Sequence, residues 1–279
     1  MGLGWHPHPD VWLLVAALAG GYAWAIRRLG PRLVHPIERA VTRRQVAAFV
    51  AGVLTIWIAS DWPVHEVAER SLYSVHMVQH LLLGLVAPPL LIVGTPPWLL
   101  RWVLRPVLGV ARLVTRPFAG FVLFNVTIAL IHVPAVVDAM IRSELAHFGM
   151  HAMLLVTALC MWSPVVNRLI ELPRLSYPGR MFYLFLQSLV PTVPASFLTF
   201  GDTVLYKAYD VMPRLWGVSA ITDQRVAGLL MKLGGGFILW GVIAWYFFRW
   251  FALEEREGAD VVEFGKLERD LNRMELTKP

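Results

Sequence analysis

Long apolar runs alternate with short polar segments along the whole chain. A run of roughly 20 mostly apolar residues is long enough to cross the hydrocarbon core of a bilayer as an α-helix. The segments between the runs contain helix-breaking pairs such as Gly30-Pro31 and Pro96-Pro97. The pattern predicts an all-α integral membrane protein whose transmembrane domain, residues 1–251, is a bundle of seven helices. The predicted spans are 10–26, 46–60, 73–94, 117–137, 146–162, 181–201 and 226–251.

Residues 252–279 form a separate, charged tail in this scheme. Apolar residues such as Val261, Phe264 and Leu271 recur there at roughly helical spacing. One interpretation is an amphipathic cytoplasmic helix that lies on the membrane surface or against a partner. The other is a flexible, solvated tail. The sequence contains no segment that predicts a soluble domain.

Composition supports the membrane assignment. The chain is 57% hydrophobic and 16% charged, whereas soluble domains average about 25% charged residues. The net charge of +6 comes from basic residues placed between the apolar runs, which is typical of membrane topology and not of a nucleic-acid-binding surface. The single cysteine, Cys160, excludes an internal disulfide and a cysteine-pair metal site.

Lysine and arginine are distributed unequally between alternate segments. The segments after the first, third, fifth and seventh predicted spans are rich in arginine, for example Arg27, Arg101 and Arg168. The segments after the second, fourth and sixth spans carry few basic residues. Because cytoplasmic loops are enriched in Lys and Arg, the alternation predicts an N-terminus outside and a C-terminus in the cytoplasm.

Histidines map almost entirely to the predicted outer side, with His35 as the exception. His76 and His80 lie in the first turns of the third span, and His147 and His151 open the fifth. Residues four apart share one face of a helix and can present two imidazoles to one ion. His132 lies in the last turns of the fourth span. The predicted metal site consists of these five residues: His76, His80, His132, His147 and His151.

Residues near these histidines favour copper among the metals that imidazole binds. Imidazole suits copper, zinc, iron and nickel, whereas thioethers are soft ligands that favour Cu(I). Met77 and Met150 stand next to histidines in the sequence and are candidate accessory ligands. Asp61 and Asp138 are candidate carboxylates that line the access route or fix the imidazole tautomers.

Three other functions remain open at this point. Paired histidines on transmembrane helices also suit a haem b protein with bis-histidine ligation and an electron-transfer role. A copper transporter would need polar residues toward the cytoplasmic half, where the third to fifth spans are nearly bare. A structural scaffold whose histidines bind nothing is the third. We predict no enzymatic activity, because the sequence has no nucleophile elbow, P-loop or dinucleotide-binding fingerprint.

Several motifs resemble those of a known family, the caa3-type cytochrome c oxidase assembly factors, named CtaG in Gram-positive bacteria. The resemblance runs over about 10–251. One family position departs from the usual pattern, since Lys232 stands where members often have Trp. The similar motifs are Ser74-Val-His-Met-Val-Gln-His80, Pro88-Pro89, Gly94-Thr-Pro-Pro97, His132-Val-Pro134 and Asp223-Gln224-Arg225-Val-Ala-Gly228-Leu-Leu-Met231.

The resemblance implies a seven-span protein of the bacterial plasma membrane that is needed for maturation of a haem-copper oxidase. It implies copper delivery as the role, with His76, His80, His132, His147 and His151 as the residues carried over by position. The expected partners are an oxidase subunit, other copper chaperones and the lipid bilayer, with no nucleic acid.

Overall fold

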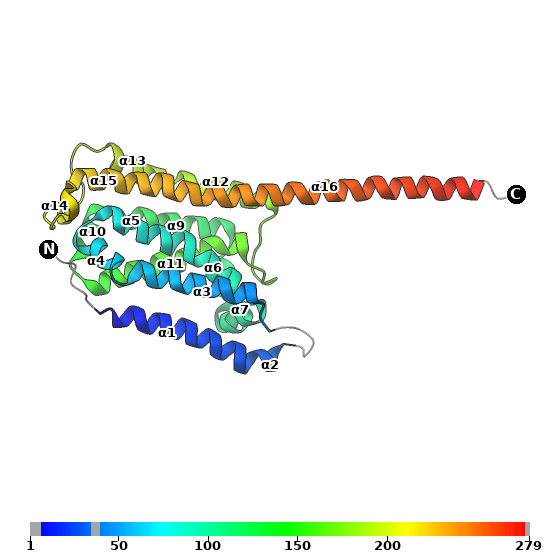
Figure 1. The fold of residues 1–279 in the computed structure, drawn as a ribbon, viewed down its shortest axis with the longest axis horizontal. Coiled ribbons are helices and arrows are strands. Elements are labelled where there is room, and N and C mark those ends of the chain that lie inside the picture. Colours follow the sequence, from blue (N-terminus) through cyan, green and yellow to red (C-terminus); the bar gives the residue numbers. More distant parts are fainter. Residues whose placement is uncertain (1–6, 35–39, 277–279) are drawn as a thin grey trace.

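The computed structural model describes residues 7–34 and 40–276, and every regular element in these ranges is a helix (Figure 1). The α-helices are interrupted by short π- or 3₁₀-helical turns, labelled η. In chain order the elements are α1 (Pro9–Trp24), η1 (Ala25–Leu29), α2 (Gly30–Leu33), α3 (Arg43–Ser60), α4 (Val64–Arg70), α5 (Tyr73–Leu81), η2 (Leu82–Val86), α6 (Ala87–Gly94), α7 (Pro97–Leu104), η3 (Arg105–Val107), α8 (Leu108–Val114), α9 (Pro117–Ile131), α10 (Pro134–Ile141), α11 (Glu144–Val166), α12 (Tyr177–Leu189), α13 (Thr192–Phe200), α14 (Lys207–Asp210), η4 (Leu215–Gly217), α15 (Ala220–Leu229), η5 (Leu230–Gly234) and α16 (Gly235–Leu276).

Six helical segments of the described residues are long and apolar enough to cross a membrane, and a bent pair of helices raises the number to seven if it counts as one span. The prediction of an all-helical, multi-pass membrane protein is therefore confirmed, and the seventh span depends on that pair. The six segments are Pro9–Leu33, Arg43–Arg70, Tyr73–Gly94, Glu144–Val166, Tyr177–Phe200 and Ala220–Arg256.

The predicted fourth span, 117–137, is not one helix. α9 ends at Ile131, and a new helix, α10, begins at Pro134. Val133 adopts an extended backbone conformation, since the residue before a proline is disfavoured in the helical region. On the other side, α9 meets the helical stretch Pro97–Val114 at 84°. The segment expected to be a loop between the third and fourth spans is thus mostly helical.

The ends of the bundle separate the connecting segments into two groups. The start of α1 lies at the same end as α4, α10 and α14, whereas α2, α7 and the far part of α16 lie toward the opposite end (Figure 1). The segments that connect the helices thus lie at two opposite ends of the bundle, as the interpretation of the arginine pattern assumes. The direction in which the bundle faces in the membrane stays a prediction.

The last helix continues past the predicted domain boundary at residue 251. α16 runs from Gly235 to Leu276 without interruption, and its final part extends well beyond the other helices (Figure 1). The backbone of the charged tail therefore continues the helix of the last span.

Close backbone contact holds α6 against α3. A methyl group built on Gly94 would lie 2.6 Å from the Cα atom of Phe49 and would also overlap its backbone nitrogen. The Tyr22 hydroxyl donates a hydrogen bond of 2.8 Å to the Gly94 carbonyl, so α1 joins the same contact. Because interiors are close-packed, no side chain larger than hydrogen fits at this position without moving a helix.

We expect Gly94→Ala to lower the free energy of unfolding by about 1–3 kcal/mol, the usual cost of overpacking. The matched control is Gly236→Ala, since a methyl group there meets no atom within 4 Å. Thermal unfolding in detergent, followed by tryptophan fluorescence, measures both. Equal unfolding temperatures for the two variants would contradict the proposed tight contact.

Candidate metal centre

Asp223 fixes the start of α5, the helix that carries His76 and His80. Its carboxylate accepts hydrogen bonds from the backbone N–H groups of Tyr73 at 2.7 Å and Ser74 at 3.0 Å. The first N–H groups of a helix have no partner within the helix, and the positive end of the helix dipole favours a negative charge. Asp223 is 1% exposed, so its two bonds are shielded from water.

Gln224 and the neighbouring loop hold the end of α9. The Gln224 side chain accepts a hydrogen bond from the backbone N–H of Leu205 at 2.6 Å and donates to the Thr203 carbonyl at 3.2 Å. The next residue, Tyr206, donates its hydroxyl proton to the His132 carbonyl at 3.0 Å. The Asp223-Gln224 pair therefore positions both α5 and the residue that ends α9.

The start of α11 positions the remaining two histidines, His147 and His151. The Ser143 hydroxyl accepts a hydrogen bond from the Ala146 backbone N–H at 3.3 Å, as an N-cap residue does. His147 and His151 follow in the first two turns and share one helix face.

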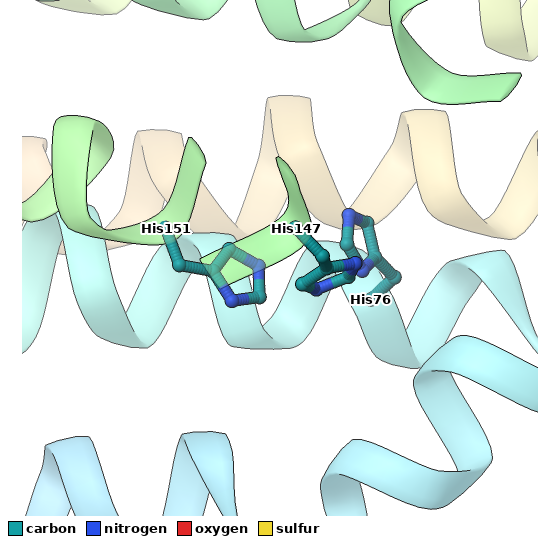
Figure 2. Close-up of side chains that lie close together, drawn as sticks. All are labelled: His76, His147 and His151. Carbon is teal, nitrogen blue, oxygen red and sulfur yellow. The ribbon is translucent and has the colours of Figure 1, made fainter. Parts of the chain in front are cut away.

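All five predicted histidines come together between α5, α9 and α11. His76, His147 and His151 each offer a ring nitrogen within 4.8 Å of the other two, and Figure 2 shows their side chains side by side. The His80 ring lies 4.3 Å from that of His76 and 5.5 Å from that of His151, measured between centroids. The His132 ring lies 6.1 Å from that of His80. The two helical pairs thus converge.

Ring nitrogens in this cluster are buried and have no hydrogen-bond partner among the described residues. They are Nδ1 of His76, both nitrogens of His80, and Nε2 of His132, His147 and His151. Buried polar atoms are normally hydrogen-bonded, and leaving one unsatisfied costs about 1–3 kcal/mol. Neutral imidazoles, each with one nitrogen lone pair, are a donor set that a transition-metal ion accepts.

The tautomer of His132 is set by the backbone. Its Nδ1 atom lies 2.7 Å from the Ile128 carbonyl oxygen, and since a carbonyl can only accept, Nδ1 carries the proton. In the neutral ring this leaves the Nε2 lone pair available to a ligand.

A cavity of about 50 Å³ adjoins the cluster on the side of His80 and His132. Met77, which is 1% exposed, lines this cavity, and Met150 packs half-buried against the core. Polar side chains meet the cavity from the later helices: Gln187, Ser188, Thr192 and Lys232.

The two carboxylates predicted as accessory groups lie in different surroundings. Asp61 accepts hydrogen bonds from the indole N–H groups of Trp12 at 2.9 Å and Trp57 at 2.6 Å. Asp138, on α10, is half-buried, and its Oδ1 atom has no hydrogen-bond partner in the described part of the chain. Within the described residues, the hydrogen bonds to the Asp61 carboxylate thus all come from tryptophans.

The carboxylate that contacts the histidines is Glu69, which the sequence analysis did not select. Its Oε1 atom lies 3.0 Å from Nδ1 of His147 and 3.2 Å from Nε2 of His65. His65 falls between the second and third predicted spans, and in the structure it lies in α4 together with Glu69. The spacing of four residues between His65 and Glu69, the same as in the two histidine pairs, is the signal that could have found them.

Comparison with known proteins identifies a family for this chain. A family model described as cytochrome c oxidase caa3 assembly factor matches residues 20–252. Two curated relatives, the uncharacterized proteins Mb0105 of Mycobacterium bovis and MT0111 of Mycobacterium tuberculosis, are each 26% identical over 237 residues, covering 77% of this chain and 34% of the relative. The chain therefore spans about a third of the length of these relatives. No solved structure matches.

We expect Asp223→Asn to weaken the start of α5, because an amide presents only one acceptor oxygen to two N–H donors. Charge-assisted hydrogen bonds contribute about 1.5–3 kcal/mol, so the variant should unfold at a lower temperature and bind metal less tightly. Asp202→Asn is the control, since that side chain is 98% exposed and should change neither property. Equal metal affinity in the two variants would contradict the positioning role of Asp223.

Proposed function

Because the chain belongs to the cytochrome c oxidase caa3 assembly factor family, we propose that it binds copper near the outer membrane face and supports metallation of a haem-copper oxidase. Copper is the cargo in this scheme. The chain would receive the ion, hold it among neutral imidazoles and release it to an oxidase subunit. The bacterial plasma membrane is inferred from the family and the outward-facing site from the arginine pattern, and both belong to the proposal.

The observation that supports copper binding is the cluster of buried ring nitrogens from three helices, which have no hydrogen-bond partner among the described residues. Imidazole binds copper in either oxidation state, and neutral ligands hold it without a permanent counter-charge. Ring centroids are 4.3–6.1 Å apart along the five histidines. An ion can therefore gain a bond to one imidazole as it loses a bond to the previous one. Such ligand exchange needs no change of oxidation state.

The haem alternative is disfavoured by the same packing. A bis-histidine haem needs a flat macrocycle between its two axial imidazoles, whereas here the rings contact one another directly. The adjoining cavity of about 50 Å³ is far below the roughly 300–1,000 Å³ of pockets that hold drug-sized ligands or cofactors. Copper therefore fits the site better than haem b.

In a host that lacks this protein we expect an oxidase depleted of copper and of activity. Expression of the wild-type chain should restore both, whereas His76→Ala/His80→Ala should leave them at the level of the deletion strain. His35→Ala is the control, because the charge pattern assigns that residue, which lies outside the described residues, to the opposite membrane face. Normal oxidase maturation with the double variant would rule out the proposed route.

The purified protein tests the bound group directly. Wild-type protein in detergent should contain or take up copper and show no Soret absorption. His76→Ala/His147→Ala, which removes one ligand from each helical pair, should lose at least tenfold in copper affinity. A red protein with a Soret band would instead support the haem alternative.

A further inference from the structure

We propose that His65, Glu69 and His147 form a second metal-binding position, next to the five-histidine cluster and sharing His147 with it. This inference rests on the proposed function, since His147 is also one of the proposed copper ligands. It adds two residues of α4 that lie outside the five histidines. The class of ligand is a divalent first-row transition-metal ion.

The three ligand atoms are already close enough for one ion. One nitrogen of each histidine and a Glu69 oxygen lie within 4.8 Å of one another. Glu69 stands between the two rings, 3.0 Å from Nδ1 of His147 and 3.2 Å from Nε2 of His65. Two imidazoles and one carboxylate are a common ligand set for divalent zinc and iron.

The two positions share a residue without sharing an atom. Nδ1 of His147 faces Glu69, whereas Nε2 is buried without a described partner and is left for His76 and His151. A neutral imidazole has a lone pair on one nitrogen and a proton on the other, so His147 releases its N–H proton to solvent when both positions hold an ion. His147 therefore connects the two ligand sets.

The ring of His65 is oriented from α5, the helix that carries His76 and His80. Nε2 of Gln79 lies 3.2 Å from Nδ1 of His65 and donates to the Ala59 carbonyl at 2.6 Å. Since Nδ1 of His65 accepts from the Gln79 amide, Nε2 carries the proton of the neutral ring and is the atom directed toward Glu69. An ion that binds Nε2 replaces this proton, which leaves to solvent past the partly exposed Glu69. Gln79 is fully buried, which fixes this arrangement.

The second position is the more accessible of the two. The side chains of Glu69 and His65 are 27% and 15% exposed, against 6% for His147. Beyond His65, the ring of His8 lies at 4.6 Å between centroids, and its Nε2 atom is buried without a described partner. Imidazoles thus continue from the five-histidine cluster to the first described residues of the chain.

The donor chemistry separates the roles of the two positions. The carboxylate gives the second position a negative charge that attracts a divalent cation, whereas the five-histidine cluster is neutral and suits copper in either state. An ion that arrives at Glu69 and His65 can pass inward as bonds to them break and bonds to His76 and His151 form. No electron is transferred in this step.

Titration of the purified full-length chain in detergent with Cu²⁺ against a competing chelator tests the inference. Wild-type protein should bind two equivalents. Glu69→Gln and His65→Ala should each weaken one equivalent at least tenfold and leave the other unchanged. Glu66→Gln is the matched control on the same helix, where Glu66 pairs with Arg70 at 2.9 Å, and it should retain both equivalents.

The reciprocal variant and spectroscopy complete the test. His76→Ala/His151→Ala should retain one equivalent, whose electron paramagnetic resonance spectrum shows two nitrogen ligands and oxygen. Glu69→Gln keeps an oxygen that can accept a hydrogen bond from His147, so a residue that only orients that ring would tolerate the change. Two equivalents of unchanged affinity in Glu69→Gln would therefore overturn the inference.

The outcomes also separate this inference from the proposed function. One equivalent in wild-type protein that is lost in His76→Ala/His151→Ala but kept in His65→Ala would overturn the second position and leave the proposed copper site standing. One equivalent that depends on His65 and Glu69 but not on His76 and His151 would support the second position and contradict the five-histidine site. Absence of binding in wild-type protein would overturn both.

Discussion

The start of α5 depends on a carboxylate that comes 150 residues later in the chain. Two backbone N–H groups at the head of this helix are buried or part-buried, where an unsatisfied donor is costly, and Asp223 accepts from both. The bond sets how far α5 lies along α15 and how it is rotated, and so where His76 and His80 point. Arg214 lies 3.8 Å from the same carboxylate and offsets part of the cost of burying it.

The neighbouring contacts extend this constraint to the whole site. α4 ends at Arg70 and α5 begins at Tyr73, so the position of Glu69 follows from that of α5. Tyr209 donates its hydroxyl proton to the Ala68 carbonyl at 2.9 Å, which fixes α4 from the same loop whose Tyr206 holds His132. The segment from residue 203 to 224 therefore positions histidines on three different helices while contributing no ligand itself.

Helical spacing was enough to predict which histidines share a face, because four residues make about one turn. It could not predict that the faces of α5 and α11 meet, since that depends on helix packing. Glu69 was missed because α4, only seven residues long, lies between two predicted spans, so the four-residue spacing of His65 and Glu69 had no predicted helix to place it on. The end of α9 was missed because the apolar run continues through Val133 and Pro134, so hydropathy conceals a break that proline imposes on the backbone.

α16 continues beyond the bundle without a break, and this continuity determines how its last turns form. Its 42 residues correspond to about 63 Å at 1.5 Å per residue, roughly twice the thickness of the hydrocarbon core. An isolated helix with the length of the part of α16 outside the bundle would be only marginally stable in water, because its first turn must form without support. Here the last span supplies that first turn, so the polar extension propagates an existing helix and needs no nucleus of its own.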